Sequence, residues 1–256
     1  MSARRWASGA LLLLGVVAAR PASAQLFSRP DEAYRSPKRF ALELRFGPYR
    51  PEIDEEFNGT KHPHETFFGK DHRLMSQVEL DYQFFNRFGS AAIGASIGYF
   101  REKAAALIET HLDNEVSPRA GDRTQLSLYP LALMLVYRAD MLWNRYAVPL
   151  VPYGKIGLNY TIWSVYNGND QVARAETQDL SGRGRGGTRG WQAAAGLALA
   201  LDFIDTGAAR ELDSETGVNH TYVFGEWDKY EVSGLGQSDR LHLGDSNWVL
   251  GLMFEF

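Results

Sequence analysis

The chain has 256 residues, with 27 basic and 31 acidic side chains and a formal net charge of −4. This acidic balance argues against a nucleic-acid partner. The sequence contains no cysteine, which excludes disulfides, thiolate metal sites and cysteine nucleophiles.

The amino terminus has the pattern of a secretory signal peptide. Arg4 and Arg5 precede an apolar run over residues 10–19, and Ala22, Ser23 and Ala24 offer small side chains for cleavage before residue 25. The run is too short to span a bilayer as a helix. We therefore expect a cleaved signal peptide at 1–24, followed by a polar periplasmic lead-in at 25–37.

Segments in which apolar and polar residues alternate follow one another through the rest of the chain. Such alternation is typical of strands with one apolar face. The sequence carries many aromatic residues and glycines but no long apolar stretch, and in a membrane only helices or closed barrels satisfy the backbone. We predict an all-β fold, a transmembrane antiparallel up-and-down barrel over residues 38–256. The expected strands are 38–49, 74–84, 91–101, 124–138, 151–163, 191–203, 218–227 and 248–256.

The connections support this count of eight. Those after the first, third, fifth and seventh strands are long and polar, as expected of external loops, whereas the others are shorter on the whole. The exception is 205–217, which we read as a turn with a short helix. A ten-stranded barrel remains an alternative if a long loop contains a hairpin.

Large apolar residues occupy every second position of the final strand. They are Trp248, Leu250, Leu252, Phe254 and Phe256. This spacing resembles the last strand of single-chain Gram-negative outer-membrane barrels, which the barrel assembly machinery reads as a signal. The resemblance implies insertion into the cell outer membrane.

Three further segments, 46–54, 207–213 and 217–222, are similar to a family of uncharacterised small outer-membrane barrels known mostly from myxobacteria. With the signal peptide and the last strand, this resemblance covers nearly the whole mature chain. It implies a fold and a location. The family has no assigned reaction or ligand, so no functional residue is transferred.

The polar faces of the expected strands place charges of both signs inside the barrel. The predicted lumen network comprises Glu43, Arg45, Glu79, Asp81, Lys155 and Asp202, with Gln77 and Glu255 on the same faces. We expect Arg45 to pair with Glu79 or Asp81 on the adjoining strand. The network either plugs the lumen or, because acids are in excess, leaves a narrow cation-preferring channel.

The long segment 165–189 is rich in glycine and arginine. Its Arg174, Arg183, Arg185 and Arg189 are candidate contacts for lipopolysaccharide phosphates, since the guanidinium suits that geometry. A mobile loop with solvated charges is the alternative.

Two local features complicate the pattern. The apolar residues of the fourth strand change phase around Pro130, which a bulge at this proline would explain. The facing of the seventh strand stays open, because Tyr222 and Phe224 compete with Val223 and Trp227 for the apolar face.

We also expect helical turns at 104–108, and we expect Trp143 and Tyr146 to lie at a membrane interface.

Candidate catalytic and metal-binding groups are few. His62, His64, Glu65, Asp71 and His72 offer metal ligands, but a solvated loop is the simpler interpretation. His242, near Asp239, Asp245 and Ser246, is the only histidine expected close to an external rim, and sequence proximity does not make a triad. No catalytic, cofactor or metal residue is assigned.

These patterns predict a non-enzymatic barrel with a structural or surface-interaction role through its long loops. A small pore for ions or amphipathic molecules is the alternative, and a lipid- or peptide-modifying enzyme is a third. The expected partners are outer-membrane lipid and lipopolysaccharide, with the assembly machinery during insertion. The ligand and the oligomeric state are not encoded in any pattern that we find.

Overall fold

A computed structural model describes residues 39–57, 61–107, 119–177, 180–235 and 240–256, so the predicted signal peptide and lead-in lie outside the described residues. The barrel strands are β1 (Phe40–Tyr49), β2 (Arg73–Asn86), β3 (Ser90–Leu107), β4 (Arg119–Arg138), β5 (Leu150–Tyr166), β8 (Arg185–Ala200), β9 (His220–Glu231) and β10 (Asp245–Glu255).

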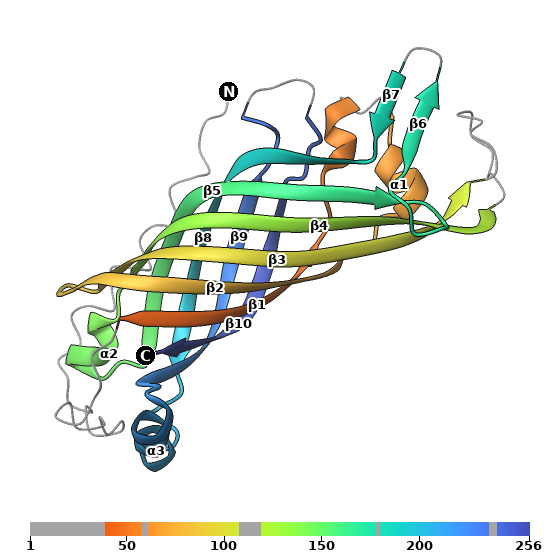
Figure 1. The fold of residues 1–256 in the computed structure, drawn as a ribbon. Helices are drawn as coiled ribbons and strands as arrows, with labels where there is room; N and C mark the ends of the chain where they lie inside the picture. The colour runs from red at the N-terminus through yellow and green to blue at the C-terminus, as the bar shows by residue number, and fades with distance from the viewer. Residues whose placement is uncertain (1–38, 58–60, 108–118, 178–179, 236–239) are drawn as a thin grey trace, which may run out of the picture.

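These strands form a closed barrel in the order β1-β10-β9-β8-β5-β4-β3-β2, and every pair is antiparallel. The predicted eight-stranded, up-and-down barrel is confirmed (Figure 1). The barrel closes where β1 meets β10, with Ala41 opposite Glu255 and Phe46 opposite Leu250. Closure leaves no barrel strand with an unpaired edge.

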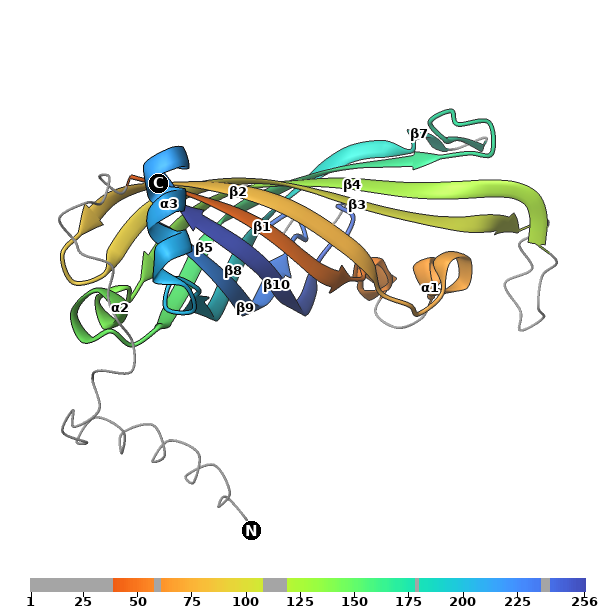
Figure 2. The same ribbon diagram turned by 90° about the horizontal axis from the view of Figure 1, so that it is seen from below.

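The two ends of the barrel differ. At the end we call the turn end, the β2–β3 turn, α2 (Met141–Tyr146) and α3 (Thr206–Thr216) connect the strands. At the opposite end, the loop end, lie η2 (Ile53–Phe57), α1 (Pro63–Phe68) and the separate hairpin of β6 (Arg174–Thr177) and β7 (Leu180–Arg183). Figure 2 shows β3 and β4 extending past the other strands at this end. None of the described helices is long and apolar enough to cross a membrane.

The helix in the 205–217 connection follows from its capping residues. Asp205 accepts hydrogen bonds from the backbone N–H groups of Gly207 and Ala208 at 2.9 and 3.0 Å. Gly217 ends the helix with a φ of 76°, which glycine adopts without strain. The predicted short helix is therefore present and spans 11 residues.

Side chains alternate between the barrel exterior and interior on every strand. In β1, Ala41, Glu43 and Arg45 are buried inside, while Phe40 and Phe46 are exposed outside. The large exposed apolar side chains include Leu80, Ile97, Leu133, Leu158, Leu197 and Leu250. The exterior is thus apolar and the interior charged, the reverse of a water-soluble protein.

Aromatic side chains border this apolar exterior on both sides. Toward the loop end lie Tyr99, Tyr129, Tyr160, Trp191, Trp227 and Trp248, and toward the turn end lie Phe40, Tyr82, Phe84 and Tyr137. From Tyr129 to Tyr137, β4 spans nine residues with both border tyrosines included, about the length that a tilted strand needs to cross a bilayer.

The predicted bulge at Pro130 is wrong. The ladder from Gln125 opposite Tyr166 to Arg138 opposite Tyr153 runs without a register shift, and Pro130 pairs within it. Pro130, Leu126 and Leu128 all point into the barrel, whereas Leu131, Leu133 and Leu135 lie on the other face. The phase change in the sequence therefore arises because this part of the interior is apolar.

Some regions expected to be loops are strand. Residues 104–107 belong to β3, so the predicted helical turns at 104–108 are wrong, and 108 lies outside the described residues. The segment 165–189 does contain a hairpin, but β6 and β7 form their own sheet and add no strand to the barrel. The barrel strand β8 begins at Arg185, earlier than expected.

Gly251 of β10 allows the interior to pack. A Cβ atom at this position would lie 2.3 Å from the Phe224 ring and 2.3 Å from the backbone oxygen of Leu44. At Gly154 of β5 the nearest atom to such a Cβ would be 3.8 Å away.

We predict that Gly251→Ala lowers the free energy of unfolding by about 1–3 kcal/mol, because the Phe224 ring and strand β1 must move away from the added methyl group. Gly154→Ala is the matched control and should change it little. Urea titration in detergent micelles measures both, and equal stability of the two variants would contradict this packing.

Candidate functional site

The barrel interior holds a cluster of charged side chains from five strands, which we call the charge network. Its cations are Arg45, Arg138 and Lys155, and its acids are Glu43, Glu79, Asp81, Glu226 and Asp228. None of these residues is more than 4 % exposed. Burial of so many charges is tolerated only where they pair with one another.

Arg45 lies at the centre of the charge network. Its Nη1 lies 2.6 Å from Glu79, and its Nη2 lies 2.6 Å from both Glu226 and Asp228. Its Nε donates a further hydrogen bond to Glu226 at 2.9 Å. Of the two partners expected for Arg45, Glu79 makes the contact, and Asp81 pairs elsewhere.

The other two cations connect the remaining acids. Arg138 Nη2 bonds Asp81 and lies 2.6 Å from Glu43. Lys155 Nζ bonds Glu43 and lies 3.0 Å from Glu79. Since Glu43 contacts both of these cations and Glu79 contacts Lys155 as well as Arg45, the ion pairs form one continuous network across the interior.

Neutral groups also donate hydrogen bonds to two of the acids. Tyr153 donates its hydroxyl hydrogen to Glu226 at 2.9 Å, and Gln192 donates to Asp228 at 3.0 Å. The Lys155 ammonium also lies 5.5 Å from the centre of the Tyr153 ring. A network of this kind is stabilising only while its partners stay together, because each unpaired ion would bear its full desolvation cost.

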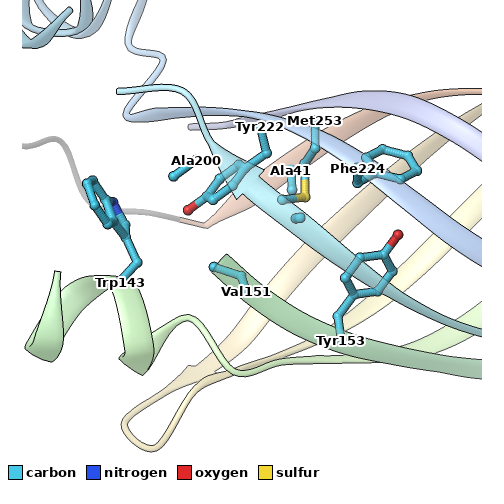
Figure 3. Close-up of a cluster of buried hydrophobic side chains, with 9 residues drawn as sticks. Ala41, Trp143, Val151, Tyr153, Ala200, Tyr222, Phe224 and Met253 are labelled. Carbon is cyan, nitrogen blue, oxygen red and sulfur yellow. The ribbon is translucent and has the colours of Figure 1, made fainter. Parts of the chain in front are cut away.

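Apolar side chains cover the charge network on both sides. On the turn-end side, Trp143, Tyr222, Phe224 and Met253 pack with Tyr153 and neighbouring alanines (Figure 3). On the loop-end side the layer comprises Tyr49, Met75, Phe100, Leu126, Leu128, Tyr230, Val232 and Leu243. The gap bordered by Tyr49, Leu128 and Tyr230 has no room for a water molecule. The charges are therefore enclosed between two apolar layers.

Two sequence expectations for the interior need correction. Asp202 does not join the charge network, because it lies past the end of β8 and bonds the ring of His220 at the turn end. Trp143 is not an interfacial residue: α2 turns its side chain into the barrel mouth, where it is 1 % exposed (Figure 3). Tyr146 of the same helix is 62 % exposed.

Three members of the charge network were missed by the sequence analysis. Arg138 ends the strand whose phase was misread, and Glu226 and Asp228 belong to the strand whose facing was left open. The structure settles that facing, since Tyr222, Phe224, Glu226 and Asp228 point inward and Val223 and Trp227 point outward. A signal was available, because a tryptophan flanked by two acids fits a strand with its ring outside and its charges inside.

The arginines proposed to contact lipopolysaccharide are not all on a loop. Arg185 and Arg189 lie on β8 and are exposed, and Arg183 at the end of β7 is also exposed. The side chain of Arg174 lies outside the described part of the chain. None of the described contacts tests lipid binding, so this remains a prediction.

The histidine-rich segment at the loop end forms a capped helix. Asp54 accepts hydrogen bonds from the backbone N–H groups of His64 and Glu65 at 2.7 and 3.0 Å. Asp54, His62 and Glu65 bring possible ligand atoms within 4.8 Å of one another. However, Lys70 donates to Glu65, and this hydrogen bond holds the pKa of the Glu65 carboxyl below its usual range. Capping of the helix therefore accounts for Asp54, and the ion pair with Lys70 accounts for Glu65.

His64 and His242 do not take part in a metal site or a catalytic triad among the described residues. His64 turns inward and lies 3.1 Å from Glu102 of β3, so it is separated from His62. Asp245, expected near His242, accepts hydrogen bonds from the backbone of Arg50 and Ser246 and from Asn247 instead. Asp239 lies outside the described residues. No contact among the described residues assembles a catalytic triad at His242.

No protein-family model and no curated protein matches this chain. Solved structures similar to it include Neisserial surface protein A, with a TM-score of 0.45, 11 % identity, and 86 % of this chain and 98 % of that chain covered. A major outer membrane protein of Thermus thermophilus matches with a TM-score of 0.44 and 9 % identity, and the match covers 86 % of this chain and 100 % of that chain. OprG of Pseudomonas aeruginosa matches with a TM-score of 0.42 and 12 % identity, and the match covers 88 % of this chain and 99 % of that chain. The resemblance to myxobacterial barrels is not confirmed by these matches, and no functional property of this chain follows from similarities of this size.

We predict that replacing a lysine of the charge network lowers the free energy of unfolding more than replacing an exposed lysine does. Lys155→Met removes one of the two cations that Glu43 and Glu79 each contact, which increases the excess of buried negative charge and should lower the free energy of unfolding by about 3–5 kcal/mol. Lys229→Met removes an exposed ion pair with Glu231 at 3.9 Å and should cost less than about 1 kcal/mol. Adding Glu43→Gln to Lys155→Met should recover part of the loss. Urea unfolding of the four chains measures these effects, and an equal cost for both lysines would contradict the network.

Proposed function

We propose that this chain is an outer-membrane barrel of a Gram-negative cell, exported by its signal peptide and held in lipid by its apolar exterior. The observation that carries this proposal is the inverted distribution of polarity: exposed leucines, isoleucines and aromatics outside, and buried charges inside. Aromatic borders on both sides of the apolar surface fit the two interfaces of a bilayer. In this orientation the turn end faces the periplasm.

The last strand fits the role of an assembly signal in this proposal. Trp248, Leu250 and Leu252 are exposed on the exterior. The backbone N–H of Phe256 donates to the oxygen of Phe40 at 2.8 Å, which extends the seam between β10 and β1. The segment that the assembly machinery would read is thus also the segment that closes the barrel.

The role supported best is non-enzymatic, structural or surface-interacting, with the loop end as the working surface. The charge network and its two apolar layers fill the interior, as expected for a barrel of this strand number. Beyond the barrel, β3 and β4 extend past the other strands (Figure 2). The helix α1 packs against β3, where His64 contacts Glu102. A filled interior, together with the helices and strands described at the loop end, favours recognition at the surface over transport.

A small pore is the second candidate. Five acids against three cations leave the charge network with an excess of negative charge, which would favour cations if the interior opened. The apolar layers and the direct ion pairs oppose such opening. A lipid- or peptide-modifying enzyme has weaker support, because His242 and Asp245 are not brought together.

Planar-bilayer recording separates the structural role from the pore. We predict that the purified native protein inserts without discrete conductance steps, because no described gap crosses both apolar layers. The double variant Arg45→Ala, Lys155→Ala removes two of the large side chains that fill the centre and serves as the positive control for a weakened plug. Discrete, cation-selective steps from the native protein would contradict the filled interior and favour the pore.

A further inference from the structure

An open groove of about 540 Å³ lies on the exterior of the barrel over β4, β5 and β8. Its walls include Leu131, Leu133, Leu158, Tyr160, Arg189 and Leu235. The leucines and Tyr160 are outward-facing side chains, so the groove opens away from the charge network. It lies at the loop-end side of the apolar exterior, next to the aromatic border.

The shape of the groove depends on local packing. The ring of Tyr160 leans over Gly187, where a Cβ would lie 2.2 Å from the Tyr160 hydroxyl. Tyr160 is directly opposite Arg189 in the ladder, and its lean toward Gly187 leaves the space beside Arg189 and Leu158 uncovered. Glycine at 187 is therefore a condition for this opening.

A segment after β9 forms the far wall. The backbone N–H of Gly234 donates to the oxygen of Arg189 at 2.9 Å, which holds the segment against β8. The next residue, Leu235, has a φ of 54° and is 59 % exposed. A left-handed conformation is unfavourable for leucine, and an exposed apolar side chain held in this way marks a candidate contact site.

The outward charges on the three strands under the groove and on β3 beside them are of one sign. Beyond Tyr99 and Tyr129, the charged outward side chains on the described parts of β3, β4, β5 and β8 are all basic: Arg101, Lys103, Arg123, Arg185 and Arg189. Within the described residues none of them forms an ion pair. Glu231 on the neighbouring β9 is the nearest outward acid in sequence register, and it pairs with Lys229 at 3.9 Å.

We propose that the groove binds one acyl chain of a lipopolysaccharide molecule, whose phosphate pairs with Arg189. This inference rests on the proposed outer-membrane location, in which the loop-end half of the exterior faces the external leaflet. An apolar trough takes an acyl chain, a guanidinium binds phosphate in a bidentate manner, and the absence of acids among these outward residues removes repulsion. Bound lipid would brace the exterior of β4, β5 and β8 just below the loop end.

The test measures retention of bisphosphorylated lipid A by native mass spectrometry of the full mature barrel in detergent. The native protein should retain one lipid A. Arg189→Gln and Leu158→Trp, which remove the phosphate contact and fill the groove, should each weaken binding by about tenfold or more. The matched controls are Arg123→Gln, on the same basic face but away from the groove, and Leu197→Trp, an exposed leucine elsewhere on the exterior.

The phosphate contact has its own readout. Lipid A lacking phosphate should bind the native protein more weakly, and Arg189→Gln should not weaken it further. Leu235→Ser offers a second groove variant that leaves the barrel strands unchanged. Equal retention by all variants, or equal losses in Arg189→Gln and Arg123→Gln, would overturn the site in favour of diffuse charge attraction.

Failure of the site is distinguishable from failure of the proposed location. Membrane fractionation and heat-modifiable gel mobility are measured on the same native and variant proteins. A barrel that fractionates with the outer membrane and shifts on heating, yet retains no lipid A, would overturn the groove assignment alone. A protein that fractionates with the periplasm and shows no shift would overturn both.

Discussion

Arg45 has no exposure to solvent and contacts Glu79, Glu226 and Asp228, which come from two other strands of the barrel. A buried guanidinium of this kind can be stable only if its partners are held in place, and here β2 and β9 hold them. Arg138 and Lys155 extend the same constraint to β4 and β5. The charge network therefore ties opposite walls of the barrel together in a way that ladder hydrogen bonds between neighbours cannot.

The apolar layers on either side of the charge network also stabilise its ion pairs. By excluding water, Trp143, Tyr222 and Phe224 at one side and Tyr49, Leu128 and Tyr230 at the other lower the local dielectric constant and strengthen each ion pair. The same exclusion makes any broken pair expensive. A filled barrel is the consequence, and such a barrel is a suitable support for the recognition that we propose at the groove and at the loop end.

Much of this architecture follows from a period of two in the sequence. All eight strands were predictable, because apolar and polar residues alternate over most of each strand, and the alternation placed Glu43, Arg45, Glu79 and Lys155 inside. The prediction weakened where both faces carry apolar residues. Leu126 and Leu128 point inward into an apolar layer, so their phase resembled a bulge that the ladder does not contain.

Other features depend on contacts that no local pattern encodes. The pairing of Asp202 with His220, the burial of Trp143 and the extension of β3 and β4 beyond the barrel all arise from tertiary packing. The groove is a further case, since it is formed by residues from β4, β5, β8 and the segment after β9. The residues of the groove are far apart in the sequence, and only the pairing of the strands brings them together.

In the proposed arrangement, lipid surrounds the barrel exterior while the interior is filled and dry. Because the chain contains no cysteine, single cysteines introduced from 129 to 137 of β4 can be spin-labelled in a vesicle-inserted barrel. We predict that labels at 131, 133 and 135 are accessible to oxygen but not to a water-soluble nickel complex, and that labels at 132, 134 and 136 are shielded from both. High accessibility of 131, 133 and 135 to the nickel complex would instead show that water surrounds the barrel and that the proposed membrane location is wrong.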